Sequence, residues 1–236
     1  MDAGPDLSVH ARAVILACGA TYRKLSLPDY ERFEGQGIHY AATALEAQFC
    51  QGSEVAVIGG GNSAGQAAVF LSRYAKHVHV LVRSDGLAES MSDYLVQRIE
   101  QSPRITLHTR TELTALHGER MLSGVSWRDG EGRETRHAIG NVFVMIGAVP
   151  NTDWLGDRVA LDERGFVLTG AGAGPGAGAS RDDTATAPRE VTPFETSQPG
   201  IFAVGDVRAG SVKRVASGVG EGSVCISTVH AYLARD

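Results

Sequence analysis

The chain has 236 residues, which is enough for one large or two modest domains with a core that needs no disulfide bonds. Its net charge of −5 comes from interspersed acidic and basic residues, which offer no basic patch for nucleic acid. No apolar run approaches the roughly 20 residues that span a membrane, and residues 1–6 lack the pattern of a secretory signal. We therefore expect a cytoplasmic protein that binds neither membrane nor nucleic acid.

The three cysteines, Cys18, Cys50 and Cys225, lie far apart and form no C-x-x-C pair. This pattern fits a reducing compartment and excludes a zinc ribbon, and it leaves no candidate metal site. Each cysteine is expected to pack as a small buried hydrophobic residue rather than to act as a reactive thiol.

The first predicted elements precede the most informative part of the chain. Residues 13–17 are continuously apolar and predict a buried strand. Pro28, Gly35 and Gly37 interrupt the next stretch, and residues 39–50 then predict a short helix or turn.

Residues 54–65 predict a β-branched strand that runs into a glycine turn and an alanine-rich helix. In the spacing Gly59-x-Gly61-x-x-Ala64, the first glycine permits the tight turn, the second lets the backbone approach a pyrophosphate, and the alanine lets helix and strand pack closely. The helix N-terminus favours the anion through its unpaired N–H groups and positive dipole end. The predicted dinucleotide site comprises Gly59, Gly60, Gly61, Asn62, Ser63 and Ala64.

A second strand, residues 78–82, ends at Arg83, about twenty residues past the glycines. An NAD site usually carries an acid there for the ribose 2′-hydroxyl, whereas an arginine suits a 2′-phosphate. Arg83 and Ser84 therefore predict NADPH rather than NADH. Arg73 and His79 could assist Arg83 in binding the 2′-phosphate, or they could be solvated. The alternative for the whole motif is a glycine turn that only packs and binds no nucleotide.

The chain after Arg83 predicts a helix, a strand and a small antiparallel meander. The helix has Ser90 or Ser92 as its cap, an apolar face and a stop at Pro103. The elements that follow are a strand at 105–107, the meander within 112–139 with its hairpin turn at 129–132, and an apolar strand at 142–146.

The last third of the chain combines a segment without large apolar side chains with two ordered elements. Residues 169–190 are rich in Gly, Ala, Asp and Thr and predict a mobile loop. Residues 200–206 predict a buried strand that ends in an acid, and residues 218–233 predict a helix.

Four stretches, in order and spacing over nearly the whole chain, resemble the bacterial-type thioredoxin reductases and related flavoproteins with two dinucleotide-binding domains. The stretches are residues 14–20, the glycine turn with Arg83, residues 147–152, and Gly205-Asp206 followed by residues 213–216. The resemblance implies an α/β, Rossmann-like three-layer FAD/NAD(P)-binding fold. In that fold, residues 39–147 would form the NAD(P)H domain, inserted between two parts, 1–38 and 148–236, of a partial FAD domain.

The resemblance also implies a role for residues outside the glycine turn. Gly147 would lie near the return to the FAD domain, and Asp206 beside Gly205 would hold the ribityl or pyrophosphate part of FAD, although a helix or turn cap is the alternative for Asp206. Residues 214–216 (Arg214, Val215 and Ala216) would lie near the flavin ring. The implied protein is a homodimer, or part of a longer multidomain parent, that passes hydride from NADPH to FAD and on to an unknown acceptor.

Three departures from the family limit this expectation. The redox C-x-x-C expected within or beside residues 41–45 is absent, so the sequence offers no catalytic residue, and neither Glu46 nor the single Cys50 replaces the dithiol. No G-x-G-x-x-G occurs elsewhere, and the chain begins after the family's first FAD-binding unit, which would expose strand edges at 13–17 and 201–204. Ser84 and Ala88 stand where the family often has further arginines, which weakens the expected preference for NADPH.

Three functions stay open at this point. The first is a thioredoxin reductase-like flavoprotein oxidoreductase or a fragment of one. The second is an enzyme like the ferredoxin or flavodoxin reductases, with a direct acceptor at the flavin. The third is an NADPH-binding regulatory module without turnover, and the retention of flavin would separate it from the enzymes.

Overall fold

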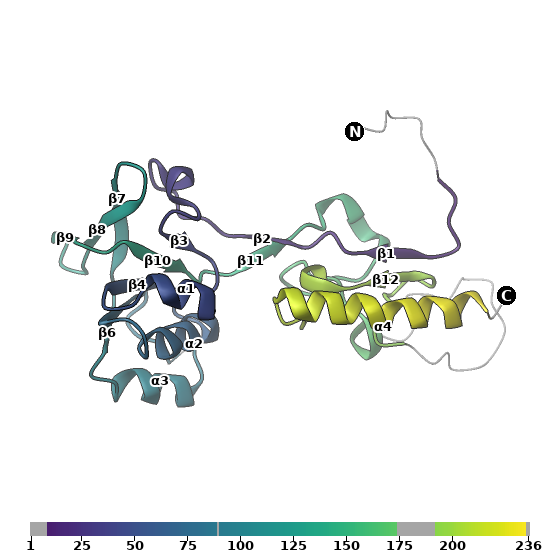
Figure 1. Ribbon diagram of the computed structural model, residues 1–236. Coiled ribbons are helices and arrows are strands. Elements are labelled where there is room, and N and C mark those ends of the chain that lie inside the picture. The colour runs from purple at the N-terminus through teal and green to yellow at the C-terminus, as the bar shows by residue number, and fades with distance from the viewer. Residues whose placement is uncertain (1–8, 89, 174–191, 235–236) are drawn as a thin grey trace. The chain divides into compact units, whose positions relative to one another are not determined.

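The computed structural model describes residues 9–88, 90–173 and 192–234. Residues 1–6 and most of the predicted mobile loop at 169–190 lie outside these residues. The chain forms two compact units, of which unit 1 comprises residues 1–21 and 148–236 and unit 2 comprises residues 22–147 (Figure 1). Residues 22–38, which the sequence grouped with the partial FAD domain, thus belong to the unit that contains the glycine turn.

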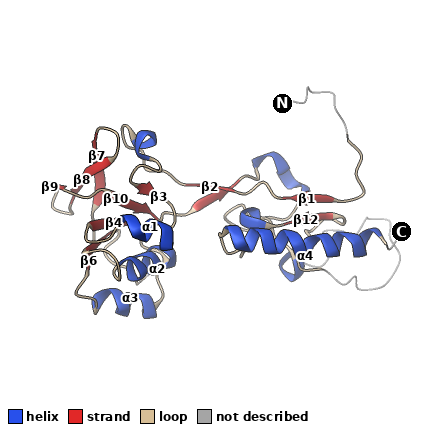
Figure 2. Cartoon of the chain, in the orientation of Figure 1, coloured by secondary structure: helices blue, strands red, loops and turns tan. Residues whose placement is uncertain are grey.

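Unit 2 is built on a five-stranded parallel sheet in the order β3-β10-β4-β5-β6 (Figure 2). A three-stranded antiparallel meander, β7-β8-β9, forms a separate small sheet. The strands of this unit are β3 (Ile38–His39), β4 (Glu54–Ile58), β5 (His77–Leu81), β6 (Ile105–His108), β7 (Glu112–Gly118), β8 (Leu122–Arg128), β9 (Glu134–His137) and β10 (Asn141–Val144). Its helices are η1 (Tyr30–Phe33), α1 (Ala44–Phe49), α2 (Asn62–Leu71) and α3 (Asp93–Glu100).

Alternation along the central strands determines what covers each face of this sheet. On β4, Val55 and Val57 pack with the cluster that contains the buried side chains of α1, α2 and α3. Ala56 and Ile58, between and after them, pack with the cluster that contains Leu113, Leu122, Val125 and Trp127 of the meander. The sheet is therefore buried on both faces, as parallel sheets usually are.

The predicted helices and turns of unit 2 are confirmed at their local signals. Thr43 and Glu46 form a capping box at the start of α1. Ser92 occupies the N-cap position of α3, although its side chain forms no capping hydrogen bond, and the apolar side chains of Met91, Leu95 and Ile99 are buried. The carboxylate of Asp129 accepts the backbone N–H groups of residues 131 and 133, which closes the hairpin turn between β8 and β9.

Unit 1 contains two small sheets and a long helix. β1 pairs in parallel with β12, and β2 pairs with β11. Its elements are β1 (Val14–Leu16), β2 (Ala20–Tyr22, whose last residue falls in unit 2), β11 (Ala148–Pro150), η2 (Asp153–Arg158), η3 (Gly170–Ala173), β12 (Ile201–Ala203), η4 (Gly205–Val207) and α4 (Val215–Leu233). Every helix in the described part of the chain is too short or too polar to cross a membrane.

Three predictions for unit 1 need correction. Residues 13–17 were expected to form a buried strand, yet β1 buries only Leu16 and leaves Val14 42% exposed, because β12 is its one strand partner among the described residues. The last helix was expected from Gly218 but begins at Val215, since Arg214 takes an extended conformation and serves as the N-cap residue. Among the described residues the second edge of β1 has no strand partner, as predicted, whereas the expected open edge at 201–204 is wrong because the segment around Glu195 pairs with the other edge of β12.

Candidate functional site

The glycine turn lies at the carboxyl end of β4, between that strand and α2. The neighbours of β4 in the sheet are β5, which follows it in sequence, and β10, which comes much later, so the strand order reverses beside β4. Open parallel sheets bind ligands at such a switch point, outside the carboxyl ends of the strands. The sheet topology therefore places the predicted dinucleotide residues at the position where this fold class binds nucleotides.

The glycines of this turn differ in backbone conformation and in the space that a side chain would have. Gly59 has a φ of +135°, and a Cβ there would lie 2.4 Å from the carbonyl oxygen of Met145, so this position excludes any side chain. Gly61 has a φ of −89°, and a Cβ there would meet only the Ser90 carbonyl oxygen, at 3.8 Å. The protein itself therefore leaves room at Gly61, as expected for a site where a ligand approaches the backbone.

The start of α2 fits an anion. Its N-cap residue, Gly61, has no side chain to cap the helix, and among the described residues no side chain forms the capping hydrogen bond. Ala64 is fully buried against β4, as predicted. No sequence motif pointed to Gly65, where a Cβ would lie 2.7 Å from Met91 Sδ, so this glycine permits close packing of α2 on the segment that leads into α3. The glycine turn and the uncapped α2 thus fit the pyrophosphate of a dinucleotide.

The segment after β5 is tied to the glycine turn by two hydrogen bonds. Ser90 Oγ donates to the Gly60 carbonyl (2.9 Å), and the Ser92 N–H donates to Asn62 Oδ1 (2.8 Å). These bonds assign Asn62 a positioning role that the sequence did not show. They also hold the segment that begins at Arg83 close to the turn.

Arg83 is exposed at the end of β5, and Ser84 next to it donates its hydroxyl to the Gly86 carbonyl (2.7 Å). A second basic residue, Arg110, lies near this segment because its backbone N–H donates to the Ser84 carbonyl (3.0 Å). The Arg110 guanidinium lies 3.5 Å from the carboxylate of Asp85. No sequence motif pointed to Arg110, which lies beyond β6.

Of the two residues named as assistants to Arg83, neither takes that role in the structure. His79 lies on β5 with its side chain 14% exposed, and both of its ring nitrogens have other partners, Glu54 and His108. It is therefore neither solvated nor directed at a 2′-phosphate. Arg73 is exposed after α2, in agreement with the alternative of a solvated side chain.

Helix α1 occupies the region where the family's dithiol was expected. The Thr43 N–H donates to Glu46 Oε2 (2.9 Å), and the Thr43 hydroxyl donates to the same oxygen. Burial raises the pKa of Glu46, but these hydrogen bonds outweigh it and leave the pKa below its usual value. Glu46 thus acts as an ionised helix cap and not as a proton donor.

Cys50, at the end of α1, is fully buried and donates its thiol to the Glu46 carbonyl (3.3 Å). Burial, with a smaller contribution from Glu46, raises the pKa of this thiol to about 11. Cys225 in α4 is also fully buried, and burial raises its pKa as well. Both cysteines pack as predicted, whereas Cys18 is only half-buried.

In unit 1, the Gly205-Asp206 pair follows β12 within η4, and the carboxylate of Glu221 on α4 organises the turn. Glu221 Oε2 accepts the Gly205 N–H (2.7 Å), and Glu221 Oε1 accepts Arg208 Nη2 (2.6 Å) and Ser211 Oγ (3.0 Å). Burial raises the pKa of Glu221, but the Arg208 guanidinium and the other donors lower it by a larger amount. The pKa of Glu221 is therefore below its usual value. Sequence reasoning missed Glu221, since nothing local links it to residue 205.

The remaining predicted positions are more open. Asp206 is half-buried, and its carbonyl accepts Lys213 Nζ (3.3 Å). Residues 214–216 are exposed at the start of α4, and Val215 is 87% exposed. In unit 2, Gly147 follows β10 with a φ of +93°, and a Cβ there would meet nothing within 4 Å. The predicted site residues are thus divided between the units: residues 59–64, Arg83, Ser84 and Gly147 in unit 2, and Gly205, Asp206 and residues 214–216 in unit 1.

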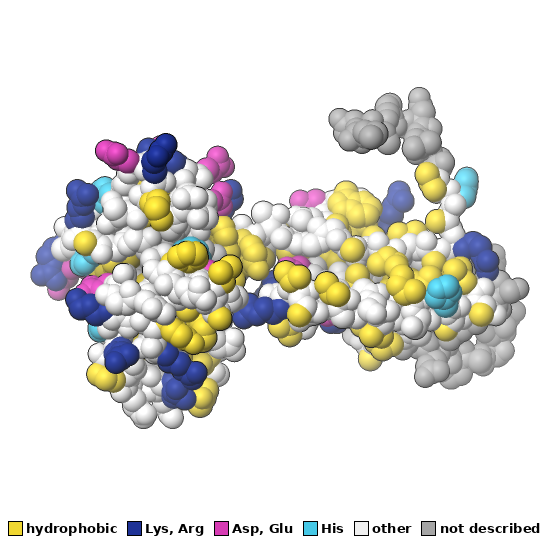
Figure 3. All heavy atoms as spheres, viewed as in Figure 1, with side chains coloured by type: hydrophobic (Ala, Val, Ile, Leu, Met, Phe, Trp, Pro, Cys, Tyr) yellow, Lys and Arg dark blue, Asp and Glu magenta, His cyan; other side chains and the backbone are white. Residues whose placement is uncertain are grey.

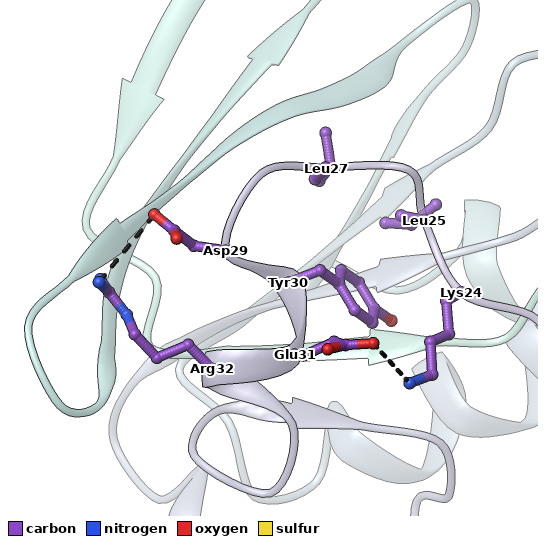
Figure 4. A pocket seen from close by; sticks show the side chains of 7 residues that line it. All are labelled: Lys24, Leu25, Leu27, Asp29, Tyr30, Glu31 and Arg32. Atoms are coloured by element: carbon purple, nitrogen blue, oxygen red, sulfur yellow. Dashed lines mark ion pairs between the residues drawn. The ribbon is translucent and has the colours of Figure 1, made fainter.

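A surface hollow of about 470 Å³ lies elsewhere in unit 2, on the segment that contains η1 (Figure 4). Its charged side chains are all paired: Lys24 lies 2.7 Å from the carboxylate of Glu34 and 3.8 Å from that of Glu31, and Arg32 lies 4.0 Å from that of Asp29. Because these charged side chains already form ion pairs, they are not arranged to bind a charged ligand. The hollow is also distant from the glycine turn in sequence.

Comparison with known proteins gives a consistent result. A model of the family described as pyridine nucleotide-disulphide oxidoreductase matches residues 2–222. The chain belongs to this family. A thioredoxin reductase of Streptomyces clavuligerus is 31% identical over 96% of this chain and 64% of its own length. The NADPH-dependent thioredoxin reductase 3 of Arabidopsis thaliana is 33% identical over 95% of this chain and 39% of its own length.

The solved structures agree with the sequence relatives. A thioredoxin reductase from Streptococcus pyogenes matches 98% of this chain and 69% of its own chain, with a TM-score of 0.75 and 29% identity. The predicted Rossmann-like FAD/NAD(P)-binding fold is thereby confirmed. Members of this family use FAD and NADPH. The chain spans between about two fifths and two thirds of the length of the curated relatives that it matches.

Proposed function

We propose that this chain binds NADPH at the glycine turn of unit 2 and contributes part of a flavin site in unit 1, within a thioredoxin reductase-like oxidoreductase. In such an enzyme NADPH supplies a hydride and FAD accepts it. The observation that carries the proposal is the glycine turn at the switch point of a parallel sheet, followed by a helix whose first turn is uncapped. Family membership supports the pairing of the two cofactors.

Each residue of the turn has a stated task in this proposal. Gly59 lets the chain reverse against the Met145 carbonyl, Gly61 leaves the approach to the backbone open, and the first N–H groups of α2 receive the pyrophosphate. Arg83 receives the 2′-phosphate, with Arg110 close enough in the fold to add positive charge. Asn62 and Ser90 keep these two segments together.

The electron acceptor of this chain would differ from that of a dithiol enzyme. Residues 41–45, which lead into helix α1, contain no cysteine, and Glu46 in that helix is an ionised cap. This observation favours a direct acceptor at the flavin, as in an enzyme like the ferredoxin or flavodoxin reductases. The NADPH-binding regulatory module stays the alternative without turnover. The family resemblance further supports a homodimer, or a longer multidomain parent, in the cytoplasm.

The absorption spectrum of the chain, recorded after incubation with excess FAD and removal of free ligand, separates enzyme from regulatory module. A retained flavin band that NADPH bleaches under anaerobic conditions supports the oxidoreductase. A chain that binds NADPH but retains no flavin is the nucleotide-binding module.

The nucleotide site is tested by Gly61→Val, with Gly86→Ala as the control because a Cβ at Gly86 meets nothing within 4 Å. We expect Gly61→Val to keep the thermal unfolding midpoint of the wild type and to weaken NADPH binding by roughly tenfold or more. Arg83→Ala should weaken NADPH more than NADH, since only NADPH carries the 2′-phosphate. Unchanged affinity in Gly61→Val removes the site from the glycine turn, and an equal loss for both nucleotides in Arg83→Ala removes its role in the preference.

A further inference from the structure

Four histidines of unit 2 gather where the β8–β9 hairpin covers the sheet. Trp127 on β8 is only 4% exposed. The ring of His137 on β9 stacks on it at a centroid distance of 3.5 Å and an interplanar angle of 13°. His79 on β5 and His108 on β6 approach the same indole at 5.4 and 5.3 Å. His77 completes the histidine cluster, with its ring 4.9 Å from that of His79.

The strand register explains why these side chains meet. On β5 the valines at positions 78 and 80 pack with the helices, so the alternate positions, including His79, face the meander. His108 is paired with Leu81, which belongs to the meander-side core. Glu54 on β4, two residues before Ala56, lies on the same side.

The hydrogen bonds order the tautomers of two of the histidines. Glu54 Oε2 lies 3.3 Å from His79 Nε2, so that nitrogen carries the proton and donates to the carboxylate. His79 Nδ1 is then an acceptor, and His108 Nε2, 3.0 Å away, donates to it. The remaining charged neighbour is Lys76, whose Nζ lies 3.0 Å from the other oxygen of Glu54.

This arrangement suits a shared proton and not a metal ion. The ring centroids of His79 and His108 are 5.3 Å apart while their nitrogens are 3.0 Å apart, so the two rings meet nitrogen to nitrogen along one line. A metal would need both lone pairs to converge on a third point. In the part of the chain that the structure describes, no three His, Cys, Asp or Glu side chains are arranged to hold a metal ion.

Burial makes the neutral form of these rings the stable one while the hairpin is in place. Burial lowers the pKa of His79, although Glu54 opposes the shift. The pKa of His108 is lowered to about 4, mainly by burial and then by the neighbouring imidazoles. Burial also lowers the pKa of His137; His79 adds to this shift and Glu54 opposes it. Protonation of His79 at Nδ1 would also place two N–H donors against each other.

We propose that the histidine cluster is an acid-sensitive switch, in which neutral imidazoles hold the outer part of the β8–β9 hairpin, residues 126–137, on β5 and β6, and protonation releases it. Leu122, at the other end of β8, is buried in the apolar core and keeps that end in place. The strand pairing of the five-stranded sheet and the apolar cluster on its helix-covered face do not involve residues 126–137.

The direction of the pH effect follows from the lowered pKa values. Above a pH of about 7 the rings are neutral whether the hairpin is held or released, so the cluster gives no pH dependence. Between about 6.5 and 4 the released hairpin takes up protons that the held hairpin does not, so acid favours release. From the pKa of His108 alone, the equilibrium constant for release should rise roughly 25-fold between pH 7.5 and pH 5.

Hydrogen exchange of the full chain at pH 7.5 and pH 5, corrected for the intrinsic pH dependence of exchange, tests the switch. We expect residues 126–137 to lose protection at pH 5 while β4 and β10 keep theirs. Equal protection of 126–137 at both pH values would overturn the proposal, and so would an equal loss in β4 and β10, because that is general acid unfolding.

Two variants remove protonation sites and keep the contacts. His108→Gln retains an N–H donor for His79 Nδ1, and His137→Phe retains the ring stacked on Trp127. Each should reduce the pH effect at residues 126–137, and His108→Gln should reduce it more because the pKa of His108 is lowered to about 4. His117→Gln is the matched control, since His117 lies on β7 of the same meander and bonds to Ser126 outside the cluster. If both cluster variants retain the full pH effect, or if His117→Gln abolishes it, the cluster is not the switch.

Discussion

The two units stabilise their candidate sites in different ways. In unit 2 the glycine turn connects a strand buried on both faces to a helix packed on that strand, so apolar packing fixes the position of the turn. In unit 1 the Gly205-Asp206 turn follows a strand of a two-stranded sheet, and one carboxylate, Glu221, binds the turn to α4. The comparison teaches that the first site depends on the sheet and the second on a polar contact.

The exposed surface shows the same contrast. Four large apolar side chains on α4 are exposed, and so are two on β1. These residues are Val215, Val219, Val224 and Ile226 on α4 and Val14 and Ile15 on β1. Hydrophobic side chains are visible on the face of the molecule drawn in Figure 3. In unit 2 the strands β4 and β5 that flank the glycine turn bury nearly all of their apolar side chains. Burial contributes roughly 1.5–3 kcal/mol for each large apolar side chain, so unit 2 gains far more from packing per strand.

The largest effect is expected from Gly59→Ala. The new Cβ would lie 2.4 Å from a backbone oxygen and would hold an alanine at a φ of +135°. We expect the free energy of unfolding of unit 2 to fall by about 3 kcal/mol or more, and we expect NADPH binding to be lost with it. Urea unfolding followed by hydrogen exchange in β4 and β5 measures it, with Gly86→Ala as control. Wild-type stability of Gly59→Ala would show that the turn can move and is not fixed by the sheet.

A smaller effect, confined to unit 1, is expected from Glu221→Gln. The carboxylate is 14% exposed and accepts from a backbone amide, a guanidinium and a hydroxyl, so losing its charge should cost about 2 kcal/mol at neutral pH. Protection of residues 201–211 from hydrogen exchange reports the loss, and Glu163→Gln, at an exposed position in the same unit, is the control.

The same variant should alter the acid response of unit 1. Because the pKa of Glu221 is lowered in the fold, its stabilisation is complete above the unfolded value of 4.5 and is lost as the pH falls through the lower folded value. Glu221→Gln should therefore lose less stability than the wild type as the pH falls below about 4.5. Parallel pH profiles for the two proteins would show that the turn is held by packing after all.

The smallest effect is expected from Thr43→Ala, which removes the cap of α1. The loss should be about 1 kcal/mol and local to that helix, because the capping box joins only Thr43 and Glu46. Exchange of the α1 amides measures it. Thr228→Ala, inside α4, is the control, since alanine is the better helix former there. A loss that extends to β4 would indicate that α1 supports the nucleotide site and is not a separate local element.

Features were predictable from the sequence where the interacting residues lie close together along the chain. The glycine turn, the start of α3 and the hairpin turn at Asp129 were predicted because each signal lies within a few residues of its effect. The Arg83 position was predicted from its spacing to the glycines, whereas Arg110 was missed because only the pairing of β6 with β5 brings it to Ser84. His79 was misjudged for the same reason, since its partners lie on other strands.

By itself, the sequence determined the α/β class, the parallel strand and helix pattern of unit 2, and the residues of the glycine turn. Backbone conformation and the alternation of apolar side chains are local, so they can be read along the chain. Only the tertiary structure decided that Glu221 holds a turn 16 residues earlier and that His79 meets a histidine 29 residues later. Polar contacts of this kind depend on the strand order and helix packing of the whole fold, which no short segment encodes.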